Sequence, residues 1–197
     1  EHDAMNATGE KGSVRARMAH DLMAAHASGR LRATLARASD FYGPHVIGAA
    51  LGERVLPNVL AGKKVSLLGA LDIPHSVSFM PDVVTTMVTI AGDERAWGKP
   101  WHVPNAPAVS QRTTIEAFAT AAGTTVKVGA VPKAALSALG LFSPMMRALK
   151  ETWYQFAEPG GTGGALAERA FGWSATPRSE GAAATVAWWR ARPAVSK

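Results

Sequence analysis

The chain has 197 residues, of which 47% are apolar and 18% are charged; it has no cysteine and a formal net charge of +6 at pH 7. This length buries roughly 70% of the surface of the unfolded chain, so we expect one core, or one core with a small lobe. The lack of cysteine excludes a disulfide scaffold and a thiolate metal site. The apolar fraction excludes intrinsic disorder, and no run approaches the length of about 18 apolar residues that typically crosses a membrane, so we expect no membrane partner.

The positive charge is dispersed along the chain. Basic residues occur as separate pairs, such as Arg15 with Arg17 and Lys63 with Lys64, and no run of basic residues is interleaved with aromatic ones. Net charge alone is a weak signal of function, so we expect no nucleic-acid partner. The sequence begins at Glu1 with no basic-then-apolar leader, which favours a cytoplasmic protein. Because the first residue is not Met, we expect either that an upstream segment has been removed or that the chain is a piece of a longer protein.

The first half of the chain alternates between helical and extended patterns. The expected elements are a helix over 13–28, a strand over 31–41, a helix over 46–62, a strand over 65–68, a helix from Asp82 to Gly92 and a short strand over 101–103. Asp82 precedes an apolar run, so we expect its side chain to cap that helix. This alternation favours an α/β sheet over an all-helical bundle.

The second half is mainly helical by the same criteria. The expected elements are a helix over 113–122, a strand over 125–131, and helices over 134–139, 145–156, 165–172 and 179–190. The glycine-rich stretch from Gly160 to Gly164 has no clear strand before it, so we interpret it as a flexible turn.

Several motifs that carry chemistry are missing from the sequence. No glycine-rich loop of the dinucleotide or nucleoside-triphosphate type joins a strand to a helix. No histidine lies in a tight metal-ligand pattern, so we expect no metal. The nucleophile elbow of serine hydrolases is also absent, although a catalytic triad can be assembled in space from distant residues.

The segment from Arg37 to Pro44 carries the most information. It reads Arg-Ala-Ser-Asp-Phe-Tyr-Gly-Pro and lies at the end of a predicted strand, just before a predicted helix. Ligands of α/β sheets collect at the carboxyl ends of strands, so its polar side chains are site candidates. The alternative is that Tyr42, Gly43 and Pro44 form only a rigid turn.

This segment and three later ones resemble the NAD-dependent epimerase/dehydratase family of extended and atypical short-chain dehydrogenases/reductases. The later segments are Phe79-Met80-Pro81-Asp82-Val83, Trp101-His102-Val103-Pro104-Asn105-Ala106, and the ending from Phe171-Gly172-Trp173 to Thr185-Val186-Ala187-Trp188-Trp189-Arg190. They occur in the order of the family, and the resemblance covers nearly the whole chain, as a carboxyl-terminal portion.

The resemblance implies a partial Rossmann-like, doubly wound sheet plus a small α+β substrate-binding lobe. Residues 1–110 would hold the remainder of the Rossmann-like domain with interleaved segments of the lobe, and 111–197 mainly the lobe. It implies NAD or NADP as cofactor and a small-molecule substrate. The dinucleotide-binding loop of the family would lie upstream of Glu1.

The resemblance also implies site residues. The catalytic candidates are Thr8, Lys11, Tyr42 and His75. The candidates that line the substrate or cofactor are Ser39, Asp40, Tyr42, Gly43, Pro44, His45, Trp101 and Tyr154. The family uses a Tyr-x-x-x-Lys pair, whereas Val46 follows Tyr42 by four residues and Glu158 follows Tyr154 by four. Alignment with the family's helix places Thr8 or a neighbour at the position of the tyrosine, and Gly12, or Lys11 after a shift of one residue, at the position of the lysine.

Three functional hypotheses remain open at this point. The first is an NAD(P)-dependent epimerase, reductase or dehydratase that acts on a small hydroxyl- or carbonyl-bearing molecule. The second is a non-catalytic ligand-binding or interaction protein on the same scaffold. The third is a cofactor-independent hydrolase, which a serine or aspartate beside His45, His75 or His102 would support. An incomplete sheet exposes apolar surface, so we also expect a homo-oligomer that uses 13–28 and 46–62 as contact surfaces.

Overall fold

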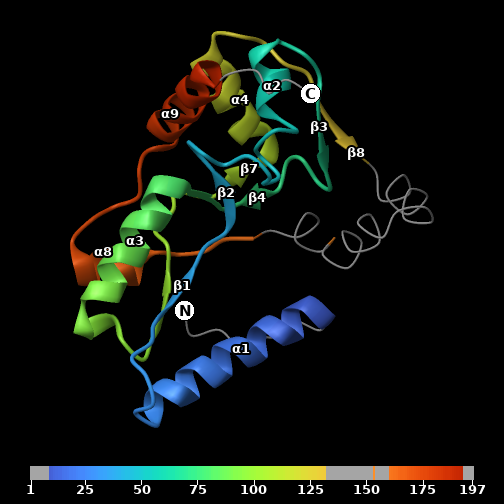
Figure 1. Cartoon of the computed structure of the whole chain (residues 1–197). Coiled ribbons are helices and arrows are strands. Elements are labelled where there is room, and N and C mark those ends of the chain that lie inside the picture. Colours follow the sequence, from blue (N-terminus) through green and yellow to red (C-terminus); the bar gives the residue numbers. More distant parts are fainter. Residues whose placement is uncertain (1–8, 132–152, 154–159, 193–197) are drawn as a thin grey trace.

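The computed structural model describes residues 9–131, 153 and 160–192. Figure 1 shows their arrangement. The helices are α1 (Glu10–Ala27), α2 (Leu56–Leu60), α3 (Met80–Gly92), the 3-10 helix η1 (Glu94–Ala96), α4 (Gln111–Ala122), α8 (Ala165–Phe171) and α9 (Arg178–Ala191). The strands are β1 (Leu35–Arg37), β2 (Asp40–Tyr42), β3 (Val65–Leu68), β4 (Pro74–His75), β5 (Val77–Phe79), β6 (Pro100–His102), β7 (Val109–Ser110) and β8 (Val128–Val131).

The described strands form four two-stranded ladders. Three are parallel, β1 with β6, β2 with β5 and β3 with β8, and the β4–β7 ladder is antiparallel. A parallel pair needs a crossover connection, and helix α3 supplies part of the one that leads to β6. The expected mixture of helices and small pieces of parallel sheet is therefore confirmed.

Two hydrophobic clusters stabilise the described part of the chain. The larger one contains α2, α4 and α9 together with Tyr42 and Phe79, and lies in the upper half of Figure 1. The smaller one joins Ile90 of α3, Trp101 of β6 and Ala167 of α8 in the lower half. β1 pairs with β6, which carries Trp101 of the smaller cluster, and β2 ends at Tyr42 of the larger one, so residues 38 and 39 join strands that lie beside different clusters.

The predicted helix over 46–62 is wrong for its first part. Only Leu56–Leu60 is helical, whereas the preceding residues form turns in which Leu51 and Val55 are still buried. Pro57 lies at the start of the helix, where proline is favoured because the N–H group that it lacks would have no partner there. The apolar pattern over 46–62 thus predicted correctly which side chains are buried, but it predicted the wrong secondary structure for residues 46–55.

Two other local predictions also need correction. The single strand expected over 31–41 is interrupted and forms β1 and β2. Asp82 does not cap helix α3, which begins two residues earlier. The Asp82 carboxylate instead accepts hydrogen bonds from the Thr176 N–H at 2.9 Å and from its hydroxyl at 2.7 Å, and so joins α3 to the segment before α9.

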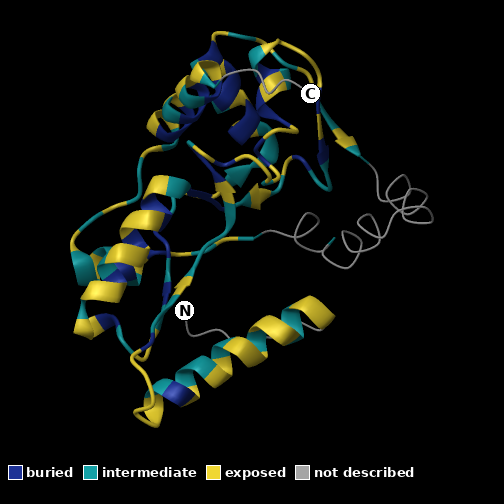
Figure 2. Ribbon diagram, in the orientation of Figure 1, coloured by how far each residue is buried: buried dark blue, intermediate teal, exposed yellow. Residues whose placement is uncertain are grey.

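The expected helix at 13–28 is confirmed as α1, but this helix is poorly covered. Ala25 is its one buried residue, and Figure 2 shows the rest as exposed or intermediate. Its Val14 and Met18 side chains are 40% and 66% exposed. A helix in a protein gains most of its stability from packing rather than from intrinsic propensity, and the 18-residue helix α1 has little such packing within the described residues. Within the described residues, no helix is long and apolar enough to cross a membrane.

Candidate functional site

The candidate site lies where the β1–β6 ladder ends and the β2–β5 ladder begins. Ser39 lies two residues after the end of β1, Asp40 is the first residue of β2, and Asn105 follows β6 by three residues. Because the two strands are parallel, these residues share the carboxyl edge of the ladder, where α/β folds bind ligands.

Asp40 and His75 come together at this edge. The two residues are far apart in the sequence, but the β2–β5 ladder brings them close, because Asp40 lies opposite Val77 in it. The distance between His75 Nε2 and Asp40 Oδ2 is 3.2 Å, and the side chains are 19% and 42% exposed. The pair is therefore partly sheltered but still reachable from solvent.

The opposite side of the His75 ring is closed by Gly160. A Cβ atom on Gly160 would lie 2.9 Å from His75 Nδ1, closer than real Cβ contacts allow. Gly160 also forms a β-bridge with His75, accepts a hydrogen bond from the Ser76 N–H at 2.8 Å and donates one to the Pro74 carbonyl at 3.1 Å. His75 is thus held between Asp40 and the glycine-rich segment.

A network of hydrogen bonds surrounds this pair. The Ser39 hydroxyl donates to the Ser76 carbonyl at 2.6 Å, and the Ser39 N–H donates to Ser78 Oγ at 2.9 Å. The Thr162 N–H donates to Ser76 Oγ at 3.0 Å, and Asn105 Nδ2 donates to Thr162 Oγ1 at 2.7 Å. The segment interpreted as a flexible turn is therefore fixed to β4, to Ser76 between β4 and β5, and to Asn105 in the loop after β6.

The residues that follow Asp40 lead away from this edge. Tyr42 is 2% exposed and packs against the rings of Phe79 and Phe118 in the larger cluster, with centroid distances of 5.3 and 5.8 Å. Burial raises the pKa of Tyr42 to about 12, an effect that the charge of Arg178 opposes and that of Asp82 reinforces. A phenol with so high a pKa is a poor proton donor at neutral pH.

The turn after Tyr42 is built from unusual backbone conformations. Gly43 has φ 128°, and a Cβ there would lie 3.1 Å from the Phe79 ring. Pro44 follows, and His45 has φ 66°, which is uncommon for a residue with a side chain. The His45 ring lies 5.0 Å from the Trp188 ring, on the side of α9. These three residues support the interpretation of a rigid turn beside the larger cluster.

The remaining predicted site residues are dispersed. Trp101 is 7% exposed, packs edge-on against Phe171 and donates from Nε1 to the Ala96 carbonyl at 2.9 Å. Lys11 lies in the first turn of α1, at the far end from the helix's buried residue. Thr8 and Tyr154 lie outside the described residues, as do the helices expected over 134–139 and nearly all of 145–156.

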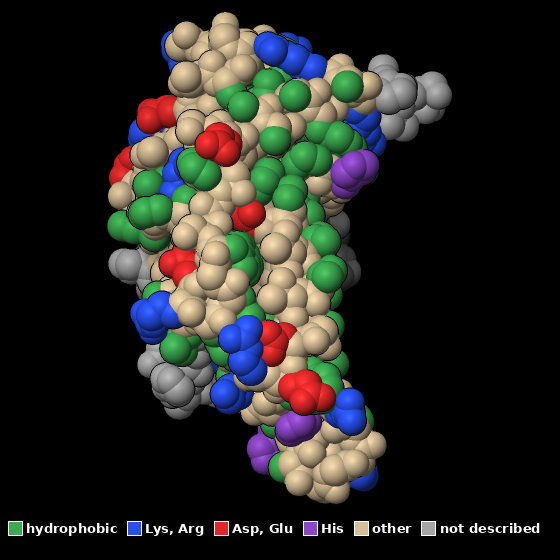
Figure 3. Space-filling view, turned by 90° about the vertical axis from the view of Figure 1, so that its left-hand side faces the viewer, with side chains coloured by type: hydrophobic (Ala, Val, Ile, Leu, Met, Phe, Trp, Pro, Cys, Tyr) green, Lys and Arg blue, Asp and Glu red, His purple; other side chains and the backbone are tan. Residues whose placement is uncertain are grey.

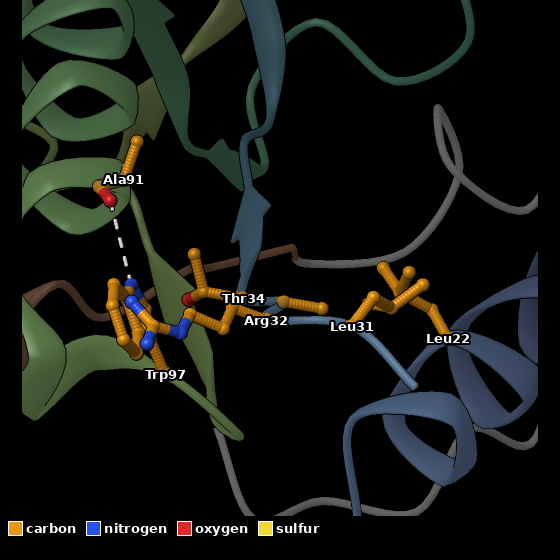
Figure 4. Close-up of a pocket in the computed structure, with 7 residues that line it drawn as sticks. Leu22, Leu31, Arg32, Thr34, Ala91 and Trp97 are labelled. Carbon is orange, nitrogen blue, oxygen red and sulfur yellow. Dashed lines mark hydrogen bonds between the residues drawn. The ribbon is translucent and has the colours of Figure 1, made fainter. Parts of the chain in front are cut away.

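A pocket of about 360 Å³ lies elsewhere, at the amino-terminal end of β1 (Figure 4). It is lined by Leu22, Leu31, Arg32, Ala33, Thr34, Ala91 and Trp97. Its polar groups already have partners: the Arg32 guanidinium lies 4.7 Å from the centroid of the Trp97 ring, and the Thr34 hydroxyl donates to the Lys99 carbonyl. It is therefore an apolar groove between α1 and α3, separate from Asp40 and His75.

Among the described residues, the glycine-rich segment before α8 differs from the pyrophosphate loop of a dinucleotide site. Two of its N–H groups, those of Gly160 and Thr162, are already bound to Pro74 and Ser76. Within the same residues, no group of three or more histidine, cysteine, aspartate or glutamate side chains could hold a metal ion.

Sequence reasoning missed several members of the network. The sequence analysis did not select Ser76, Ser78, Asn105 and Thr162, although Asn105 follows the predicted strand over 101–103 and Ser39 lies near the end of the one over 31–41. The same strand-end criterion would have found Asn105. Thr162 carried no such signal, because its position depends on a β-bridge between residues far apart in the sequence.

The fold is similar to those of several solved enzymes. A dTDP-glucose 4,6-dehydratase from Bacillus anthracis in complex with NAD matches 96% of this chain with a TM-score of 0.68 at 15% identity. A UDP-glucuronic acid 4-epimerase from Bacillus cereus with UDP-glucuronic acid and NAD matches 95% with 0.69 at 14%, and a UDP-glucose 4-epimerase from Thermus thermophilus with NAD matches 91% with 0.66 at 18%.

These enzymes are NAD-dependent epimerases and dehydratases, and their likeness confirms the Rossmann-like fold expected from the sequence. The chain spans 56%, 57% and 53% of their lengths, respectively. The sequence itself matches no protein-family model and no curated protein.

Proposed function

We propose that this chain is the substrate-binding part of an NAD(P)-dependent epimerase, reductase or dehydratase that acts on a small hydroxyl- or carbonyl-bearing molecule. The observation that carries the proposal is the meeting of Ser39, Asp40 and His75 at the carboxyl edge of the β1–β6 ladder, in a fold shared with such enzymes. The residues that hold the pyrophosphate would lie beyond those that the structure describes. The chain's own contribution would be to bind and orient the substrate beside the nicotinamide end of the cofactor.

The two ends of the cofactor allow a direct test. We expect reduced nicotinamide mononucleotide to shift the backbone amide NMR signals of Ser39 and Asp40 saturably, and ADP to leave them unchanged, because the described residues offer no pyrophosphate loop. Replacing His75 by alanine should weaken the response, whereas the same change at His20, which is 79% exposed on α1, should not. A response to ADP alone, or to neither probe, would refute the oxidoreductase proposal.

The Asp40–His75 pair also bears on the hydrolase hypothesis, because it places an aspartate beside a histidine. A serine hydrolase needs the nucleophile on the other ring nitrogen. Here Gly160 packs against that nitrogen, and the nearby Ser39 hydroxyl donates to a backbone carbonyl instead. These contacts favour the oxidoreductase proposal over the hydrolase. The second hypothesis, a ligand-binding or interaction protein without chemistry, would be favoured if neither nicotinamide mononucleotide nor ADP shifts the signals of Ser39 and Asp40.

We also propose that the chain forms a homo-oligomer through α1. The exposed apolar side chains Val14 and Met18 support this, together with the poor coverage of the helix. Light scattering should show a dimer or larger assembly at micromolar concentration, and Met18→Glu should shift it towards the monomer. The same change at Met87, which is 55% exposed on α3, is the matched control. A wild-type chain that is a folded monomer would contradict the proposal.

A further inference from the structure

Helix α3 has no charged residue from Val83 to Gly92, although much of this stretch is exposed. A helix at the surface of a protein normally presents charged and polar side chains to solvent, and a helix that is apolar on several sides is normally covered on several sides. The polar side chains in this part of α3 are all threonines. The composition of α3 is therefore typical of a helix with more than one covered face.

Only one face of α3 is covered by the described residues. That face contains Val83, Thr86 and Ile90. A second face carries apolar residues at the i, i+3, i+4 and i+7 spacing of a helical stripe, and we call it the α3 stripe: Val84, Met87, Val88 and Ala91. Its three larger side chains are 52%, 55% and 69% exposed, and Figure 2 shows exposed residues along this helix. The α3 stripe is thus an apolar surface without a cover.

The α3 stripe runs into the groove between α1 and α3, because Ala91 lines that groove. Figure 4 shows Arg32 beside Trp97 there, with the guanidinium 4.7 Å from the centroid of the ring. Tryptophan and arginine are enriched among the residues that contribute most of the binding energy at protein interfaces. The stripe and the groove together therefore offer a length of apolar contact surface with an anchoring site at one end.

The charge of this surface is a single cation. Arg32 is the one charged residue among those that line the groove. Within the described part of the chain no carboxylate pairs with it: Asp93 is bound to Arg95 at 2.6 Å, and Glu94 and Asp21 do not line the groove. Stacking on Trp97 uses the face of the guanidinium and leaves its N–H groups for an acceptor. A carboxylate brought to Arg32 by a partner would gain a charge-assisted hydrogen bond.

We propose that the α3 stripe and the groove form a docking site for an amphipathic helix of another protein, which lays its apolar residues along α3 and places a carboxylate beside Arg32. A second copy of this chain fits less well. The exposed face of another α3 has no carboxylate, and α1 has three basic residues against two acidic ones. The inference is independent of the proposed function, because the surface contains none of Ser39, Asp40 and His75.

Three synthetic peptides of about 18 residues, long enough to form a helix, test this site. The first has leucines at i, i+3, i+4 and i+7 with glutamates beside them, the second has the same leucines with lysines, and the third is a scrambled form of the first. We expect the acidic helix to shift the amide NMR signals of Val84 and Val88 and the indole N–H signal of Trp97 saturably. It should bind about tenfold or more tightly than either of the others, the ratio expected from one charge-assisted pair. Added salt should reduce its advantage over the basic peptide.

Two pairs of variants locate the contact. Met87→Glu places a carboxylate in the middle of the α3 stripe and should abolish binding, whereas Met18→Glu, on α1, should leave binding unchanged. Arg32→Gln should remove the preference for the acidic over the basic peptide, whereas Arg30→Gln, at an exposed arginine outside the groove, should keep it. All four positions are exposed, so each variant should remain folded.

Equal binding of the acidic and basic peptides, unchanged binding by Met87→Glu, or no shift at millimolar peptide would overturn the inference. A wild-type oligomer that Met87→Glu converts to a monomer would assign this face to a second copy instead. Shifts caused by vesicles of anionic lipid, without any caused by the peptides, would assign it to a membrane surface. The nicotinamide test reads the signals of other residues, so its failure would refute the proposed function and leave this inference standing.

Discussion

Replacing Gly181 by alanine is expected to destabilise the chain by about 1–3 kcal/mol, the typical cost of overpacking a core. Gly181 lies in α9, and a Cβ there would be 2.5 Å from Tyr42 Oη and 3.1 Å from two carbons of the ring. The Tyr42 ring cannot move aside easily, because Phe79 and Phe118 pack against it. Alanine favours a helix by up to about 1 kcal/mol over glycine, so the observed loss is what remains after this gain. Urea unfolding measures it.

A second substitution identifies the cause. Tyr42→Phe removes the oxygen atom that a Cβ on residue 181 would meet first, so the double variant should be more stable than Gly181→Ala alone. Gly92→Ala, at the end of α3 with nothing within 4 Å of the new Cβ, is the matched control and should be neutral or slightly stabilising. Wild-type stability for Gly181→Ala, or no recovery in the double variant, would disprove the close approach of α9 to Tyr42.

Replacing Phe118 by alanine should cost about 3–5 kcal/mol, a large fraction of the stability of a small domain. Phe118 is 1% exposed and lies in α4, at the centre of the larger cluster between α2 and α9. The change removes a ring and leaves a cavity that the surrounding helices fill only in part. Thermal and urea unfolding both report the loss.

Val88 provides the control for this core substitution. It is an apolar residue in α3 that is 69% exposed, so Val88→Ala should change stability by less than about 0.5 kcal/mol. A Phe118→Ala variant that loses no more than this control would mean that the larger cluster is not the stabilising core of the chain.

The sequence patterns predicted elements best where local signals agree. Helix α4 was expected over 113–122 and forms at Gln111–Ala122, with Ser110 accepting a hydrogen bond from the Thr113 N–H and Gly123 in the left-handed conformation at its end. The helix predicted over 46–55 was wrong because the buried apolar side chains there are spaced as in a helix, although the chain forms turns. The capping role predicted for Asp82 was wrong because its carboxylate binds Thr176, a partner 94 residues away that no local pattern reveals.

The candidate site was predictable in part for a related reason. The strand-end criterion selected Ser39 and Asp40, and the family resemblance selected His75, but neither could tell that Asp40 and His75 touch. That contact depends on the register of the β2–β5 ladder. Tyr42 was selected from the same segment, but it lies at the far end of β2, where it is buried in the larger cluster against Phe79 and Phe118.

The separation of the two hydrophobic clusters has a consequence for cooperativity. Each cluster could open with its own free energy, since local unfolding follows contiguous packed units. Asp40 lies where the chain enters the larger cluster, and Asn105 follows the strand that carries Trp101 of the smaller one. The hydrogen bonds from Asn105 through Thr162 and Ser76 to Ser39 cross between the two units, so their strength decides whether the protein melts in one step or in two.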